Sequence, residues 1–132
     1  MSKENVDRCY QAYDAFNRRD FDAGLALHCP DAEITPLVAA VGSPYRGHDG
    51  VRRYWRDVLS LFPDFTSEAL EVRDLGELTL SSVRFRGHGA GSDAPIDQTV
   101  WQLAQWRDER IAWWRSYASE PEALAAAGEA PA

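Results

Sequence analysis

The stretch Ile96–Ala118 (IDQTVWQLAQWRDERIAWWRSYA) constrains the fold of this chain most, because it carries four of the five tryptophans. Two apolar runs rich in β-forming residues flank a charged turn, which predicts a long antiparallel hairpin. Successive strand residues point to opposite faces, and Trp101 and Trp113 stand at odd positions while Trp106 and Trp114 stand at even ones, so both faces carry tryptophan. Both faces therefore need cover. Helices from the first half of the chain can cover one, and a partner subunit or a further layer must cover the other.

Length and charge limit the possible classes of protein. With 132 residues, the chain is expected to form one domain over 1–132, with a core at about 5–118 and a tail at 119–132. A formal charge of −7 argues against a nucleic-acid partner, and no apolar run is long enough to span a bilayer. The N-terminus lacks a secretory apolar stretch, and two sparse cysteines are typical of a reducing compartment. We expect a cytoplasmic protein.

The first half of the chain shows apolar residues at helical spacing. A first helix is expected to end at 17–19, and Asp20 is expected to cap a short second helix that reaches His28 and ends at Pro30. A short strand at 31–35 and a loop at 37–45 should follow. A third helix should then end at Pro63.

From Phe65 the apolar period shifts towards two, which predicts strands at 65–74 and 78–88 before the tryptophan-rich hairpin. The alanine-rich end, 122–132, is expected to form a frayed helix. This order of elements predicts an α+β fold in which a cone-like, curved antiparallel or mixed β-sheet wraps around about three helices. Such a wrap leaves a hollow where ligand sites are common.

Four segments resemble the nuclear transport factor 2-like (cystatin-like) superfamily, and within it the SnoaL-like domain proteins that include polyketide cyclases. They are AFNRRDFDAGLALHCPDAEI, YRGHDGVRRYW, RGHGAGS and RIAWWRSYASEPEALAAAG, within a match over Asn5–Gly128. The resemblance implies a cone-shaped pocket, a small apolar or carbonyl-containing ligand, and a homodimer built on the outer sheet face. Folds host many chemistries, so the activity must be argued from the site.

In the steroid isomerase branch of this superfamily, the general base occupies a position that corresponds to Pro36 of this chain. Proline cannot accept a proton. The helix tyrosine of that branch falls near Ala12, with Tyr13 one residue away and turned by about 100°. Its late aspartate falls on Trp101 or Gln102. Because none of these positions matches, that constellation is not expected here.

The epoxide hydrolase branch needs an Asp-Arg-Asp set across the pocket. Arg84 and Asp97 could supply two of its members, but no second aspartate is evident.

Two residues are candidate catalytic bases. His28 has an ordinary pKa near neutrality, and the alternative is a capping or hydrogen-bonded core histidine. Glu33 would suit acid or base work if it faced inward, where burial would raise its pKa. With Ile34 in the core, Glu33 would instead face solvent or an arginine.

Six residues are candidate ligand-binding groups. Some are aromatic and could equally be plain core, and the polar ones could orient a ligand carbonyl. They are Tyr13, Trp55, Asp97, Gln102, Trp114 and Ser116.

No cofactor or metal site is expected, because the His, Cys, Asp and Glu residues near His28 are scattered by a change from helix to strand. The leading hypothesis is a homodimeric pocket protein that catalyses cofactor-free isomerisation, cyclisation or dehydration next to a carbonyl. In that case His28 or Glu33 would be the base, and Tyr13 or Gln102 would orient the oxygen. The alternatives are a ligand-binding protein without catalysis and a dimerisation module with a filled interior.

Overall fold

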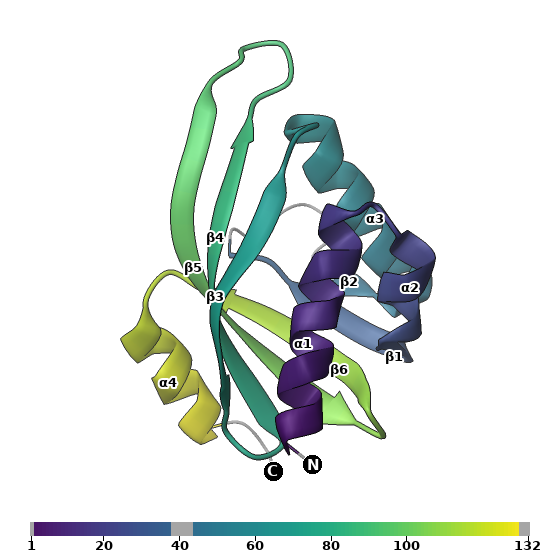
Figure 1. Cartoon of the computed structure of the whole chain (residues 1–132), viewed down its shortest axis with the longest axis vertical. Coiled ribbons are helices and arrows are strands. Elements are labelled where there is room, and N and C mark those ends of the chain that lie inside the picture. The colour runs from purple at the N-terminus through teal and green to yellow at the C-terminus, as the bar shows by residue number, and fades with distance from the viewer. Residues whose placement is uncertain (1, 38–43, 130–132) are drawn as a thin grey trace.

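The computed structural model of the chain describes residues 2–37 and 44–129 and shows a mixed α+β fold (Figure 1). A single six-stranded sheet has the strand order β2-β1-β6-β5-β4-β3. The elements are α1 (Ser2–Asn17), α2 (Phe21–Ala26), β1 (His28–Thr35), β2 (Tyr45–Arg46), α3 (Gly47–Leu61), β3 (Thr66–Asp74), β4 (Leu78–His88), β5 (Pro95–Arg107), β6 (Arg110–Tyr117) and α4 (Glu120–Glu129).

The sheet is mixed because β1 runs parallel to β6, while the other neighbouring strands are antiparallel. The predicted turn between β5 and β6 is present, and its residues Asp108 and Glu109 both have positive φ (52° and 69°). Positive φ at both central residues is the geometry that matches the twist of a tight hairpin.

The helices cover the two faces of the sheet unequally. Figure 1 shows α1, α2 and α3 on one side of the sheet and α4 on the other. The predicted separation of the tryptophans is confirmed: Trp106 and Trp114 lie in the core under the first three helices, and Trp101 and Trp113 pack in a second cluster on the outer face. Hereafter the face under α1–α3 is the inner face, and the opposite one is the outer face.

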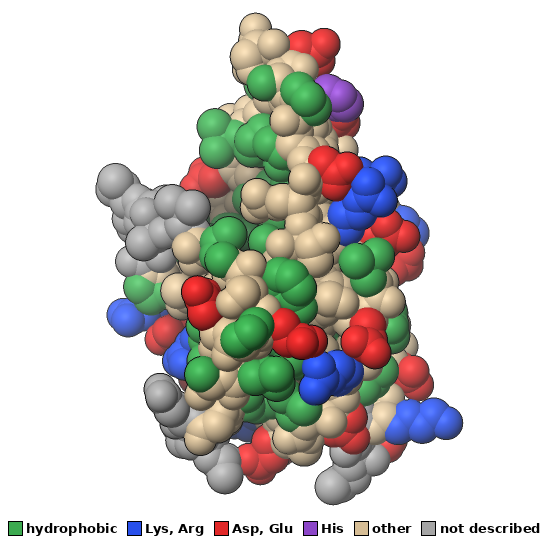
Figure 2. All heavy atoms as spheres, turned by 90° about the vertical axis from the view of Figure 1, so that its left-hand side faces the viewer, with side chains coloured by type: hydrophobic (Ala, Val, Ile, Leu, Met, Phe, Trp, Pro, Cys, Tyr) green, Lys and Arg blue, Asp and Glu red, His purple; other side chains and the backbone are tan. Residues whose placement is uncertain are grey.

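The outer face carries a further layer supplied by the chain itself. Ala123 of α4 is fully buried against Leu80 and Leu103. The side chain of Arg73 on β3 also binds Glu120 of α4 at 3.1 Å. Figure 2, viewed from this side, shows hydrophobic side chains interrupted by acidic and basic ones. The expected C-terminal helix is therefore present as α4, and its described part packs against the sheet.

The largest boundary error concerns Pro30. The sequence predicted that this residue ends a helix, but α2 ends at Ala26, and His28 and Pro30 are already in β1. The pairing of β1 with β6 is irregular between His28 and Glu33, and proline is tolerated at such breaks in a ladder. The expected loop at 37–45 lies largely outside the described residues, which resume before the short strand β2.

Candidate functional site

A pocket of about 70 Å³ lies between the inner face of the sheet and the helices α1 and α3. This volume is several times what a water molecule needs and well below a site for a drug-sized ligand. Seven aromatic rings line it, and no charged side chain does so among the described residues. The lining is Ala12, Tyr13, Phe16, His28, Ile34, Tyr54, Trp55, Val58, Phe65, Ser67, Phe85, Gln102 and Trp114.

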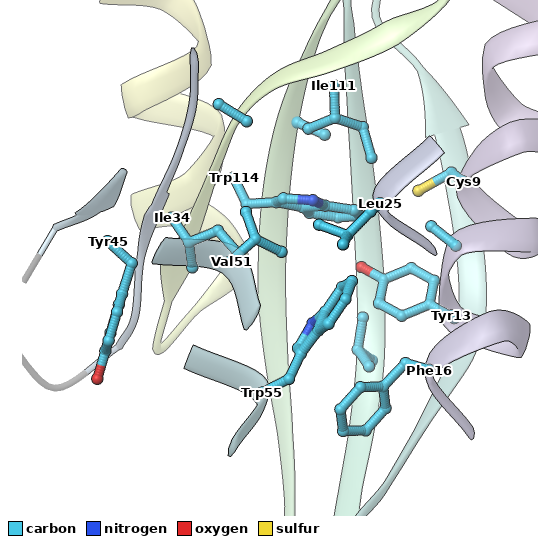
Figure 3. Close-up of a cluster of buried hydrophobic side chains, with 14 of the residues drawn as sticks. Cys9, Tyr13, Phe16, Leu25, Ile34, Tyr45, Val51, Trp55, Ile111 and Trp114 are labelled. Atoms are coloured by element: carbon cyan, nitrogen blue, oxygen red, sulfur yellow. The ribbon is translucent and has the colours of Figure 1, made fainter. Parts of the chain in front are cut away.

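Three aromatic residues from different elements define the shape of the pocket. Figure 3 shows Tyr13 of α1, Trp55 of α3 and Trp114 of β6 pointing towards one another. The rings of Tyr13 and Trp114 meet edge to face with centroids 5.4 Å apart. Such contacts hold aromatic rings in a preferred mutual orientation.

A chain of hydrogen bonds forms the polar end of the pocket. The hydroxyl of Tyr13 donates to Oε1 of Gln102 at 2.6 Å, and Nε2 of Gln102 donates to the hydroxyl of Ser116 at 2.9 Å. Burial raises the pKa of Tyr13 well above its ordinary value, so its phenol keeps the proton. An amide nitrogen has two N–H groups, and the second one of Gln102 has no partner within the described ranges. It is available to a ligand carbonyl.

His28 is held as a neutral imidazole. Its Nε2 lies 2.9 Å from the indole nitrogen of Trp114, and its Nδ1 lies 2.7 Å from the carbonyl oxygen of Gly24. An indole N–H can only donate and a carbonyl can only accept, so Nε2 accepts and Nδ1 carries the proton. Burial lowers the pKa of His28 to about 4. Both nitrogens are therefore engaged, as the alternative of a hydrogen-bonded core histidine supposes.

Gly24 also leaves the space that the ring of Trp55 occupies. A Cβ at Gly24 would lie 2.9 Å from Cη2 of Trp55, a distance that real Cβ atoms essentially never show. The ring of Trp55 meets His28 edge to face at 5.8 Å between centroids. The carbonyl of Gly24 thus accepts a hydrogen bond from His28, and the missing side chain of Gly24 leaves room for a pocket ring.

Two of the expected site residues lie away from the pocket. Glu33 of β1 points away from Ile34 and lies 3.3 Å from the guanidinium of Arg46. Asp97 of β5 accepts two hydrogen bonds from Arg84, at 2.9 and 2.7 Å, in an exposed pair. Neither carboxylate lines the cavity.

The structure brings the remaining expected residues together. Tyr13, Trp55, Gln102 and Trp114 line the pocket, and Ser116 accepts a hydrogen bond from the side chain of Gln102. Of the two strand positions considered for the late aspartate of steroid isomerases, the one that faces inward is Gln102.

Sequence reasoning missed Ser67 as a pocket residue. It is 5% exposed and lies on β3 between the exposed residues Thr66 and Glu68. This alternation could have placed Ser67 on the inner face. The pairing with Phe85, which brings both to the pocket wall, is a tertiary feature.

The parts of the chain that the structure describes hold neither a metal-binding cluster nor a membrane-spanning helix. No group of three or more His, Cys, Asp and Glu side chains gathers to hold a metal ion there. None of the described helices combines the length and the apolarity needed to cross a membrane.

Comparisons with known proteins agree on one family. The sequence model of the SnoaL-like domain matches residues 10–114. No protein with a curated description matches significantly.

Three solved structures share the fold. IdmH from Streptomyces antibioticus, a proposed polyketide cyclase, is 25% identical, with a TM-score of 0.74 over 94% of this chain and 98% of that one. An NTF2-like protein of unknown function from Burkholderia pseudomallei is 20% identical, with a TM-score of 0.80 over 95% and 97%. A protein with a ketosteroid isomerase-like fold from Catenulispora acidiphila, in complex with trimethylamine, is 18% identical, with a TM-score of 0.71 over 88% of each chain.

Proposed function

The chain belongs to the SnoaL-like domain family, and from this premise we propose that it binds a small, uncharged, largely apolar organic molecule in its inner pocket. The observation that carries the proposal is the lining: seven aromatic rings, one buried polar chain, and no charged group among the described lining residues. A charged ligand would lose its hydration there without gaining a counter-ion. A neutral ring would bury its apolar surface and could direct a carbonyl or hydroxyl oxygen to Gln102.

Binding without acid–base chemistry is the form of this function that the geometry favours. A general base must reach the proton that it removes and have a pKa near the working pH. His28 could accept a proton only after releasing Trp114, and its pKa is lowered to about 4 by burial. Glu33 is paired with Arg46 outside the pocket.

A second candidate function is catalysis next to a carbonyl, favoured by the likeness to IdmH, a proposed polyketide cyclase. In this version Gln102 holds the carbonyl oxygen and His28 removes a neighbouring proton once Trp114 has moved. The test is deuterium exchange at the α-carbon of acetophenone in D₂O, followed by NMR. Exchange above the buffer rate that disappears in His28→Gln supports catalysis, and exchange at the buffer rate supports binding alone.

The proposed binding can be tested by calorimetric titration with three molecules of similar size: acetophenone, benzoate and benzylammonium. We expect saturable binding of acetophenone and at least about tenfold weaker binding of both ions. Tighter binding of benzylammonium would contradict a neutral ligand and favour a cation held on aromatic faces. That outcome would agree with the relative crystallised with trimethylamine.

A pocket-filling variant shows where the molecule binds. Val58→Trp places a large ring in the lining, whereas Leu61→Trp adds the same ring to an exposed position of the same helix. We expect the first variant to lose acetophenone binding and the second to keep it. Equal binding by both would contradict the inner pocket as the site.

We also propose that the outer face forms a homodimer. On this face Trp113 is half-buried and stacks with the guanidinium of Arg115 at 4.1 Å from the ring centroid, and Trp101 is also half-buried. These groups remain partly accessible beside α4. Native mass spectrometry at micromolar concentration tests the proposal, and a monomer would contradict it.

A further inference from the structure

The hydroxyl of Ser67 is a polar group on the pocket wall that the rest of the site does not use. It is open to the cavity, because no fully buried side-chain N or O atom of the described residues lacks a hydrogen-bond partner. Ser67 is 5% exposed and lines the cavity. Both of its hydrogen bonds with other side chains involve its main chain, and its hydroxyl has no partner among residues 2–37 and 44–129. Polar groups in protein interiors are normally hydrogen-bonded, so an unpaired hydroxyl that faces a cavity is available to a partner inside that cavity.

The main chain of Ser67 is held in place from outside the sheet. β3 is an edge strand, and the side-chain amide of Asn17 binds Ser67 at its free edge. Nδ2 of Asn17 donates to the carbonyl oxygen at 2.8 Å, and Oδ1 accepts from the backbone N–H at 2.9 Å. Because both backbone groups are satisfied, the main chain that carries the hydroxyl is held in place before any ligand arrives.

Ser67 and Gln102 lie at opposite ends of the pocket. Ser67 pairs with Phe85 of β4, whereas Gln102 pairs with Ser81, four residues away on the same strand. The backbone positions of Ser67 and Gln102 are therefore about 14 Å apart along the strand direction. They are also two strand spacings of about 5 Å each apart across the sheet, because β4 lies between β3 and β5. The wall between the two ends is mainly aromatic.

We propose that Ser67 is a second polar anchor of the pocket, so that the ligand is an uncharged molecule with oxygen groups at two separated points and an apolar middle. The carbonyl end lies at Gln102, and a hydroxyl, ether or second carbonyl lies at Ser67. This inference rests on the proposed binding function and specifies its ligand class. A ligand without the second oxygen leaves Ser67 unpaired and loses affinity.

The experiment compares 4-(4-hydroxyphenyl)butan-2-one with 4-(4-methylphenyl)butan-2-one, which has nearly the same shape but no second oxygen. The flexible carbon chain lets the two oxygens of the first ketone reach partners that are farther apart than an acetophenone could bridge. Each is titrated by calorimetry, at a pH where the phenol is neutral, into wild type, Ser67→Ala and the matched control Ser82→Ala. Ser82 lies on β4 and does not line the pocket. Wild type and Ser82→Ala should prefer the hydroxy ketone by about five- to tenfold, the effect of one hydrogen bond. Ser67→Ala should bind both ketones equally.

The outcomes separate the two proposals. If wild type binds both ketones equally, the pocket function stands and the anchor role of Ser67 is wrong. If neither ketone binds, the proposed function fails, and with it the inference that rests on it.

Tyr54 also lines the pocket, and its hydroxyl has no hydrogen-bond partner in the described ranges. A preference lost in Tyr54→Phe but retained in Ser67→Ala would overturn the assignment to Ser67.

Discussion

The indole N–H of Trp114 donates a 2.9 Å hydrogen bond to Nε2 of His28, which ties the last strand of the sheet to the first. The bond works together with the one from Nδ1 of His28 to the carbonyl of Gly24, at 2.7 Å. Histidine has a pKa close to neutral pH in water, but these two hydrogen bonds make His28 a fixed, uncharged part of the pocket wall.

The first prediction is that His28 makes stability depend on pH. Burial lowers its folded-state pKa from 6.5 to about 4, so between these values the unfolded chain binds more protons than the folded one. The contribution of neutral His28 to the free energy of unfolding should therefore be fully present above the unfolded pKa. It should fall as the pH decreases through the window, by about 3 kcal/mol in total. Urea unfolding at several pH values measures this. His28→Gln should lack this slope, and an unchanged slope in that variant would contradict the assignment.

The second prediction concerns the buried pair Tyr13 and Gln102, joined at 2.6 Å. Tyr13→Phe leaves Oε1 of Gln102 without its donor and should destabilise the protein by about 1–3 kcal/mol. Gln102→Leu removes the other partner. If the hydrogen bond couples the residues, the double variant should lose less than the sum of the single losses. Additive losses in urea unfolding would contradict the coupling.

The third prediction compares two helical glycines. Gly24→Ala would force its Cβ to 2.9 Å from Trp55, and we expect a loss of about 1–3 kcal/mol from overpacking. The same change should weaken acetophenone binding because Trp55 lines the pocket. Gly128→Ala is the control, because nothing lies within 4 Å of its Cβ position. It should stabilise α4 slightly, by up to about 1 kcal/mol. Thermal unfolding of both variants provides the measurement.

The fourth prediction tests whether α4 is part of the fold. Ala123 is fully buried against the outer face, whereas Ala125 of the same helix is exposed. Ala123→Glu should destabilise the protein by about 2 kcal/mol or more, because it buries an unpaired polar group. Ala125→Glu should have little effect. If both variants unfold at the same temperature, the packing of α4 on the outer face does not stabilise the protein in solution.

The fifth prediction concerns the exposed pair Asp64 and His88, which joins the end of β4 to the turn after α3. Nδ1 of His88 lies 2.7 Å from Oδ2 of Asp64, and the backbone N–H of His88 donates to Oδ1, also at 2.7 Å. The pKa of His88 is raised by its hydrogen bond with Asp64, and the pKa of Asp64 is lowered by its hydrogen bond with His88.

The signs of these two pKa shifts define a pH window. The contribution of His88 is complete below its unfolded pKa and is lost as pH rises through the raised folded value. That of Asp64 is complete above its unfolded pKa and is lost as pH falls through the lowered folded value. His88→Gln should therefore destabilise the protein more at about pH 5.5 than at about pH 9, and salt should reduce the difference. An equal effect at both pH values would contradict the ion pair.

The candidate site was only partly predictable from sequence. Alternation along β5 and β6 correctly placed Gln102 with Trp106, and Ser116 with Trp114, because side-chain direction in a strand has a period of two. Alternation could not say which carboxylates or imidazoles would be free to react. His28 became engaged through Trp114, which is 86 residues away in the chain. Ser67 became a pocket residue because β3 pairs with β4 in one particular register.

By itself, the sequence determined the α+β class, the long tryptophan-rich hairpin and the division of its tryptophans between two faces. These features depend on local spacing, which each segment carries regardless of its neighbours. Only the tertiary structure decided that Pro30 lies within a strand, that α4 covers the outer face, and that His28 is neutral while Ser67 is unpaired. The physical reason is that burial and hydrogen-bond partners come from segments distant in the chain, which spacing alone does not specify.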